Sequence, residues 1–229
     1  DLGYIDSAVY SLAECYLDYD HMEAFAIYDG EILIDGQSIN DLSYLQDVGL
    51  VMDDSFLGKD WTLKLVNEAM DVGYKNWDSD SYFSYLEKFG LEKEKKVSEL
   101  SRGMKIKLML SIAFSHQARI LILDEPTSGL DPAMRDELVN IILEFMEDDQ
   151  NTVLFSTHIT QDLHRIADYI IFIDDGKIVF EGTKDEFYEK FLLIKGAIND
   201  FDKIRNYKIF GVKTTKVNFE ALVLKEDYE

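Results

Sequence analysis

The chain has 229 residues, 47% of them hydrophobic and 30% charged, which suits one substantial globular domain with a small appendage. Its 45 acidic and 23 basic residues give a formal net charge of -22, and this disfavours general binding to nucleic acid, whose phosphates carry the same sign. No run approaches the roughly 18 consecutive apolar residues of a spanning helix, the N-terminus lacks the pattern of a signal peptide, and the single Cys15 excludes an internal disulfide and fits a reducing compartment.

Strand-like and helix-like segments alternate along most of the chain, which is the pattern of an α/β fold with parallel strands. Residues 30–39 predict a strand and a short return around an Asp-Gly turn. Residues 47–54 predict a second strand that ends in two acids. Bulky residues at helical spacing fill residues 61–90, which end at Gly90, a candidate C-cap. A further helix is expected over residues 105–117.

The second half of the chain continues the alternation. A buried strand is predicted at residues 119–124, followed by a helix that Asp131 caps and that has Pro132 at its first position. A strand is then expected at residues 152–158 and a short helix at residues 160–167. A hairpin with an Asp-Gly turn is expected at residues 169–182, and a helix with a mixed tail at residues 183–229.

Two adjacent carboxylates, Asp124 and Glu125, follow the apolar residues of the strand at 119–124. Ligands of open parallel sheets lie at the carboxyl ends of strands, and Mg²⁺ prefers oxygen ligands while keeping several waters. The first acid is therefore suited to hold the water shell of a metal ion, and the second is suited to polarise an attacking water for phosphoryl transfer. Taken alone, paired acids at a strand end are equally compatible with a capping or turn role.

Four motifs in a fixed order make the chain resemble the nucleotide-binding domain of ATP-binding-cassette (ABC) transporters. The segment ILILDEP resembles the Walker B strand of that family, and SGLD at 128–131 resembles its D-loop. LSRGM at 100–104 is similar to the family signature LSGGQ, and STH at 156–158 supplies a switch histidine. Each motif alone has limited specificity, whereas the four together are highly specific.

The resemblance assigns chemistry to the acids and to the histidine. It implies that Asp124 binds Mg²⁺, that Glu125 is the catalytic base, and that His158 hydrogen-bonds the γ-phosphate of ATP and the attacking water. Asp53 stands where the family carries a glutamine that touches the metal. Because an acid can also coordinate a hard cation, Asp53 is interpreted either as a further Mg²⁺ contact or as part of a solvated turn.

The signature and the D-loop imply contacts to ATP that is held by a second subunit. Ser101 and Gly103 lie at the start of a predicted helix, where N–H groups and the positive end of the dipole favour a phosphate. Gly103 has no Cβ, so its backbone can approach a ligand closely. In the family the D-loop, here with Asp131, crosses the dimer interface. Without the Walker B strand nearby, LSRGM would be interpreted as an ordinary helix cap.

The phosphate-binding loop of the family, G-x-x-x-x-G-K-[ST], does not occur in the 229 residues. The pairs Gly58-Lys59 and Gly176-Lys177 lack both the earlier glycine and the following Ser or Thr. The family carries this loop shortly before the strand predicted at residues 30–39. A truncated or rearranged gene product, an omitted internal segment and a degenerate subunit are three explanations that stay open.

The fold implied by the resemblance is that of the P-loop NTPases, an α/β fold with a mainly parallel sheet, an ABC-type helical subdomain at about residues 60–117 and a small C-terminal extension. We expect an atypical N-terminal segment over residues 1–29, the ATPase core over residues 30–182, and a C-terminal helix and mixed tail over residues 183–229.

The function implied by the resemblance is that of an ATP-binding and ATP-hydrolysing subunit in a bacterial exporter-like branch. The cofactors are ATP and Mg²⁺, and the partners are a second ABC subunit, in a homo- or heterodimer, and separate membrane-spanning subunits at the cytoplasmic face of the membrane. No nucleic acid partner is expected. Two alternatives remain: a degenerate pseudo-ATPase that lends its signature to a partner, and a soluble ABC ATPase outside transport. The single cassette, the acidic surface and the lack of coiled-coil heptads disfavour the last.

Overall fold

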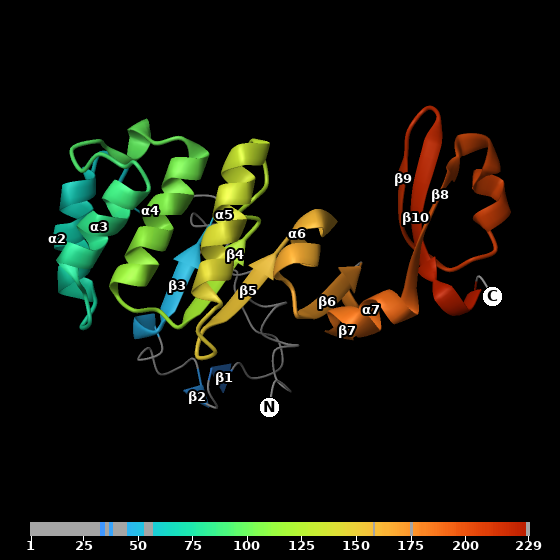
Figure 1. Ribbon diagram of the computed structural model, residues 1–229, viewed down its shortest axis with the longest axis horizontal. Helices are drawn as coiled ribbons and strands as arrows, with labels where there is room; N and C mark the ends of the chain where they lie inside the picture. Colours follow the sequence, from blue (N-terminus) through green and yellow to red (C-terminus); the bar gives the residue numbers. More distant parts are fainter. Residues whose placement is uncertain are drawn as a thin grey trace. The chain divides into compact units, whose positions relative to one another are not determined.

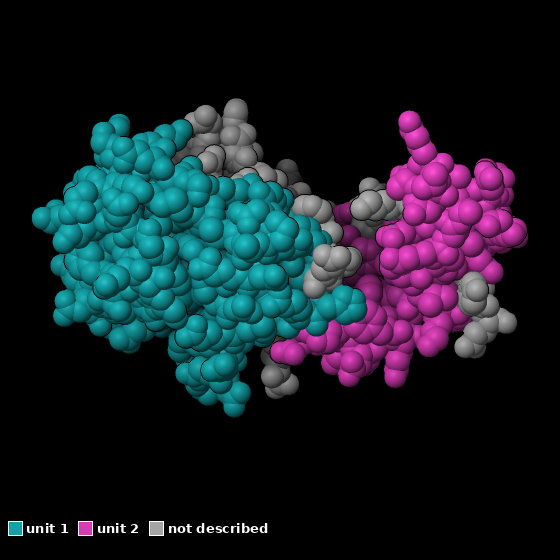
Figure 2. All heavy atoms as spheres, turned by 45° about the horizontal axis from the view of Figure 1, so that its top comes forward, with its two compact units in different colours: residues 1–166 teal, residues 167–229 magenta. Residues whose placement is uncertain are grey.

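The chain divides into two compact units, with the boundary between Ile166 and Ala167 (Figure 2). The computed structural model describes residues 33–34, 37–38, 45–52, 57–157, 159–174 and 176–227. The domain limits predicted from the sequence, with a core over residues 30–182, stay predictions, and the boundary between the compact units lies within that core.

The first unit is built on a parallel sheet of three strands in the order β3-β4-β5 (Figure 1). These strands are β3 (Val48–Val51), β4 (Ile120–Asp124) and β5 (Thr152–Ser156). Both pairings are parallel, so the carboxyl ends of the strands meet at one edge of the sheet. A separate antiparallel pair, β1 (Leu33–Ile34) and β2 (Gln37–Ser38), corresponds to the predicted strand and return.

The central strand β4 was predicted to be buried, and it is buried on one face only. Leu121 and Leu123 are 0% and 1% exposed, whereas Ile120 and Ile122 are half-buried. Successive side chains of a strand point to opposite faces, and the leucine face packs in the hydrophobic core with α4 and α5.

The helices of the first unit are α2 (Leu63–Gly73), α3 (Ser79–Lys88), the 3₁₀ turn η2 (Val97–Glu99), α4 (Arg102–Ser115), α5 (Pro132–Phe145) and α6 (Thr160–Ile166). Polar side chains cap four of them: Thr62 caps α2, Asp78 caps α3, Ser101 caps α4 and Asp131 caps α5. The helical spacing over residues 61–90 did not indicate the break that separates α2 from α3. Asp78 starts the second helix after that break, because its carboxylate accepts the N–H of Ser81 at 3.0 Å. Gly90 follows α3 with φ +69°, as expected of a glycine after a helix.

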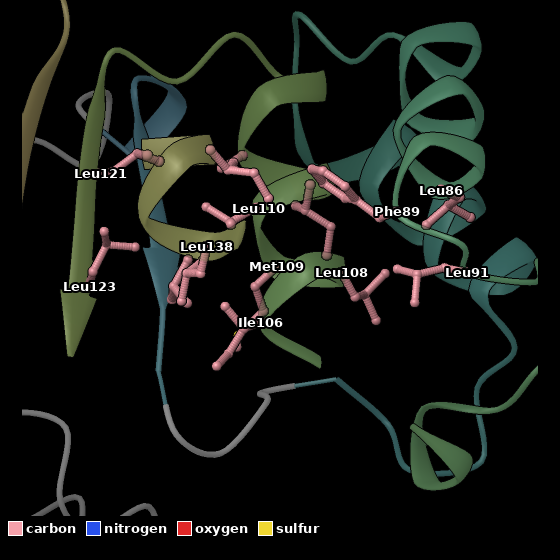
Figure 3. Close-up of a cluster of buried hydrophobic side chains, with 14 of the residues drawn as sticks. Leu86, Phe89, Leu91, Ile106, Leu108, Met109, Leu110, Leu121, Leu123 and Leu138 are labelled. Carbon is pink, nitrogen blue, oxygen red and sulfur yellow. The ribbon is translucent and has the colours of Figure 1, made fainter. Parts of the chain in front are cut away.

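Helix α4 lies at the centre of the core of the first unit. Its buried residues fall on all sides of the helix, which is the pattern of a helix enclosed by other elements, and they include Ile106, Leu108, Met109, Leu110 and Ile112. Figure 3 shows side chains of β4 on one side of α4, and Leu86 of α3 with Phe89 and Leu91 on the other. The signature segment therefore begins a rigidly packed helix.

Gly49 of β3 packs closely against Ala113 of α4. A Cβ at this position would lie 2.4 Å from Ala113 Cβ and 2.8 Å from Leu121 Cδ2, so Gly49→Ala requires the core to shift. We expect the free energy of unfolding, measured by urea denaturation, to fall by about 1–3 kcal/mol. Gly73→Ala is the control, because nothing lies within 4 Å of its Cβ position and alanine favours a helix. Unchanged stability of Gly49→Ala would contradict this packing.

The second unit begins with the predicted hairpin, β6 (Tyr169–Asp174) and β7 (Lys177–Thr183), with Gly176 at φ +70° in the turn. Where the sequence indicated only a helix and a mixed tail, the structure forms α7 (Lys184–Lys190) and a three-stranded antiparallel sheet in the order β8-β10-β9. The remaining elements are β8 (Phe191–Ala197), η3 (Ile198–Ile204), β9 (Ile209–Thr214), β10 (Asn218–Leu224) and η4 (Lys225–Asp227). Among the described helices, none combines the length and apolar character that a membrane crossing requires.

Candidate functional site

Ser156 connects the two acids at the carboxyl edge of the sheet. It ends β5 and lies opposite Asp124, the last residue of β4. The Ser156 hydroxyl donates to Asp124 Oδ1 at 2.6 Å, and the hydroxyl oxygen accepts the N–H of Glu125 at 3.1 Å. The same N–H lies 3.1 Å from the carbonyl oxygen of Ser156. One residue of the neighbouring strand thus fixes the carboxylate of the first acid and the backbone of the second.

The backbone of Glu125 is in the left-handed region, with φ +45°. This region is unfavourable for a residue with a Cβ and persists where the surrounding bonds determine the conformation. Here the carbonyl oxygen of Glu125 accepts from Arg102 Nη2 at 3.3 Å and from the N–H of Ser128 at 3.1 Å, while its N–H is held by Ser156. Such strained residues cluster at active sites, which supports a functional role for Glu125.

Ser101 caps α4, which was the alternative interpretation of LSRGM, and the helix begins at Arg102 rather than at the predicted residue 105. Ser101 Oγ accepts the N–H of Met104 at 3.3 Å, at the start of α4. A hydroxyl that accepts one hydrogen bond keeps its own hydrogen for donation. The first N–H groups of a helix point out of its N-terminus, so this end of α4 combines N–H donors with a hydroxyl donor, which is a suitable arrangement for a phosphate.

Gly103 is buried, and its Cβ position faces a neighbouring helix. A Cβ there would lie 3.0 Å from Cγ and 3.1 Å from Sδ of Met134 in α5. The missing side chain thus lets the signature helix pack against the first turn of α5. Close approach to a phosphate, the role predicted from the sequence, stays a prediction.

The D-loop ends in a cap. Asp131 Oδ1 accepts the N–H groups of Ala133 and Met134, each at 3.1 Å, and Pro132 is the first residue of α5, as predicted. Gly129 supplies a turn with φ +70°. The carboxylate of Asp131 therefore has a structural contact in its own chain, and its predicted role toward ATP of a second subunit stays a prediction.

Two of the predicted site residues, Asp53 and His158, lie outside the described residues. Asp124 and Glu125 are neighbours in the chain, and the structure adds two contact residues that the motifs did not indicate, Ser156 and Arg102. A signal existed for both. Ser156 belongs to the STH motif, and Arg102 replaces a glycine of the family signature.

The possible metal ligands at the end of β4 are the carboxylate oxygens of Asp124 and the hydroxyl oxygen of Ser156. Oxygen ligands are the type that Mg²⁺ prefers. Among the described residues, no group of three or more His, Cys, Asp or Glu residues is placed to hold a metal ion. Mg²⁺ is commonly held by one or two carboxylates together with water and substrate phosphates, so a single carboxylate at the strand end fits it. A closed zinc site would need four nitrogen or sulfur ligands.

Comparison with known families and sequences finds ATP-binding proteins among the relatives of this chain. The family described as "AAA domain, putative AbiEii toxin, Type IV TA system" matches residues 16–161, more than half of the chain. The lantibiotic transport ATP-binding protein SrtF of Streptococcus pyogenes is 32% identical over 162 residues, which cover 68% of each chain. The ABC transporter ATP-binding protein YtrB of Bacillus subtilis is 25% identical over 205 residues, which cover 87% of this chain and 70% of YtrB.

Solved structures confirm the predicted fold. An ATP-binding subunit of an ABC transporter superposes with a TM-score of 0.60 at 24% identity, over 73% of this chain and 72% of the other. A dimeric, post-hydrolysis ATP-binding cassette, MJ0796 with ADP and Pi, gives 0.59 at 23% identity, over 68% and 74%. Together with the match to SrtF, these findings show that the chain belongs to the ATP-binding subunits of ABC transporters.

Proposed function

We propose that the chain is the ATP-binding and ATP-hydrolysing subunit of an ABC transporter, in which ATP closes a dimer and hydrolysis reopens it. The observation that carries the proposal is the arrangement at the carboxyl edge of the sheet. There, Ser156 holds both Asp124 and the strained backbone of Glu125. Family membership supports ATP hydrolysis as the reaction. The contacts of Ser156 support different roles for the two acids, with Asp124 as a metal ligand and Glu125 as the catalytic base.

In this proposal Glu125 accepts a proton from the water that attacks the γ-phosphate. The Ser156 and Arg102 contacts fix its backbone, which limits the positions that its carboxylate can reach, and general-base catalysis requires the base to lie within hydrogen-bonding distance of the water. Asp124, with Asp53 as a second contact, would hold Mg²⁺ through its water shell. When bound, Mg²⁺ neutralises charge on the phosphates. His158 would donate a hydrogen bond to the γ-phosphate.

The dimer part of the proposal places ATP between two subunits. The N-terminus of α4, with Ser101 and Gly103, would contact the γ-phosphate of ATP held by the second subunit, and the D-loop with Asp131 would cross the interface. The resemblance to the dimeric cassette MJ0796 supports this arrangement. The second subunit is either another copy of this chain or a related ABC subunit.

The transport part of the proposal adds separate membrane-spanning subunits, with the chain peripheral at the cytoplasmic face. The names of SrtF and YtrB, both ATP-binding proteins of transport systems, support it. We also propose the exporter-like branch, which rests on the variant signature LSRGM at 100–104. We propose no nucleic acid partner, because the net charge of -22 would repel phosphates.

A second candidate function is that of a subunit that does not hydrolyse ATP itself. Its signature segment, LSRGM, would contact ATP that is bound by a partner subunit. The observation that favours it is the absence of the G-x-x-x-x-G-K-[ST] pattern from the 229 residues. In that role Ser101 and Gly103 would still contact the nucleotide of the partner, whereas Glu125 would not act.

The test uses a restored chain, which we define as this chain with the strand, phosphate-binding loop and following helix of SrtF placed before Gly30. ATP hydrolysis by the restored chain is measured with Mg²⁺ present. Turnover that depends on Glu125 would support the proposed function. ATP binding without any turnover would contradict it and favour the second candidate.

A further inference from the structure

A cluster of three side chains lies beside the D-loop, formed by the buried Thr127 and Asp162 and by Arg135, whose side chain is 23% exposed. The hydroxyl of Thr127 donates to Asp162 Oδ2 at 2.6 Å. Arg135 donates through Nε to Oδ1 at 2.9 Å and through Nη2 to Oδ2 at 3.2 Å. Thr127 is 1% exposed and Asp162 is 3% exposed. The Asp162 carboxylate therefore receives three hydrogen bonds away from water.

The three residues come from segments on both sides of the D-loop. Thr127 directly precedes the loop, and Arg135 lies in the first turn of α5, directly after it. Asp162 belongs to α6, the helix that follows β5. Along the chain, α5 precedes β5 and α6 follows it (Figure 1). One carboxylate thus binds the residue just before the loop and a residue in the first turn of the helix after it.

Stability alone does not account for such a cluster. Taking a charge out of water is costly, and a buried ion pair contributes little more than apolar residues of the same volume would. Helices α5 and α6 are also joined by an exposed pair, in which Arg165 Nη1 donates to Asp136 Oδ1 at 2.6 Å. The feature that the buried cluster adds is the contact to Thr127, which fixes the start of the D-loop.

Two backbone turns shape the D-loop next to this cluster. The N–H of Ser128 donates to the carbonyl oxygen of Glu125 at 3.1 Å, and the N–H of Leu130 donates to the carbonyl oxygen of Thr127 at 3.3 Å. Gly129 lies between them with φ +70°. Because Thr127 begins the second turn, a displacement of Thr127 would also disturb the shape of that turn.

We propose that Asp162 is a positioning residue that holds the D-loop in the shape offered to the second subunit. It also ties the start of the loop to α6. The proposal rests on the proposed function, because the D-loop acts at a dimer interface only if the chain works as an ABC subunit.

The test is amide hydrogen exchange in the purified 229-residue chain, which needs no nucleotide. Thr127→Val keeps the shape of the side chain and removes the hydroxyl. We expect exchange of the Ser128 and Leu130 amides to accelerate by about tenfold to a hundredfold, the effect of losing a hydrogen bond to a charged group. The amide of Leu123, in the core strand β4, should keep its rate. Asp162→Asn should act in the same direction.

Two controls separate positioning from general stability. Thr127→Ser retains the hydroxyl and should restore the wild-type rates at both D-loop amides. Asp136→Asn breaks the exposed pair between the same two helices and should leave those rates unchanged. Acceleration of Ser128, Leu130 and Leu123 by one common factor would overturn the proposal, because it would reveal only a weaker fold.

Unchanged D-loop rates in Thr127→Val would also overturn the proposal, as would a Thr127→Ser chain that behaves like Thr127→Val. None of these outcomes bears on ATP turnover by the restored chain. Failure of the positioning role and failure of the proposed function are therefore distinguishable.

Discussion

Glu125→Gln in the restored chain is expected to lower ATP turnover by about 10²- to 10⁴-fold, the range for loss of a general base. Glutamine has nearly the shape of glutamate, so the backbone contacts to Ser156 and Arg102 remain. The amide, however, cannot accept a proton from the attacking water. ATP affinity should stay close to that of the unsubstituted restored chain. Phosphate release measures turnover, and calorimetric titration with Mg-ATP measures affinity.

Glu144→Gln is the matched control for this substitution. Glu144 lies on α5, its side chain is 64% exposed, and it pairs with Lys88 at 3.1 Å on the surface of the first unit. The same chemical change there should leave turnover unchanged. Near-normal turnover in the Glu125→Gln chain would remove Glu125 from the role of catalytic base.

Ser101→Arg in the 229-residue chain is expected to weaken its ATP-dependent association with the restored chain by about tenfold or more, the effect of losing a hydrogen bond to a charged group. The substitution removes the hydroxyl donor and places a large side chain at the N-terminus of α4. In this mixed pair, the restored chain binds the nucleotide and the 229-residue chain supplies the signature. Sedimentation of fluorescently labelled 229-residue chain, with and without a slowly hydrolysed ATP analogue, measures the association.

Ser98→Arg is the control for the Ser101 experiment. Ser98 is an exposed serine of η2, the turn before the signature. The Ser98→Arg substitution therefore introduces the same charge and bulk close to the signature. Its association should equal that of the unsubstituted chain. If the Ser101→Arg chain also associates normally, the assignment of LSRGM as a phosphate-binding signature is wrong.

Local patterns in the sequence were sufficient for the central elements of the fold. Alternation of strands and helices predicted the parallel sheet, and Asp131 with Pro132 predicted the start of α5, because a cap and its helix are neighbours in the chain. The C-terminal sheet was not predicted. Its pairs join β8 to β10 across η3 and β9, and such pairing depends on packing between distant segments.

The candidate site was predictable to the same extent. The motifs identified Asp124 and Glu125, whose spacing is local. Ser156, Arg102 and Asp162 were missed as contact residues, because each acts on a partner far away in the sequence. The separations are 31 residues for Ser156 and Glu125, 23 for Arg102 and Glu125, and 35 for Asp162 and Thr127. Only the folded chain brings these groups within hydrogen-bonding distance.

The most direct measurement of the central claim is sedimentation velocity of the restored chain carrying Glu125→Gln, with and without Mg-ATP. If ATP closes a dimer and hydrolysis reopens it, blocking hydrolysis should accumulate the closed form. We predict a monomer without nucleotide and a dimer with Mg-ATP. An unchanged sedimentation coefficient, in a sample where calorimetry shows that ATP is bound, would contradict the claim that ATP closes a dimer of these subunits.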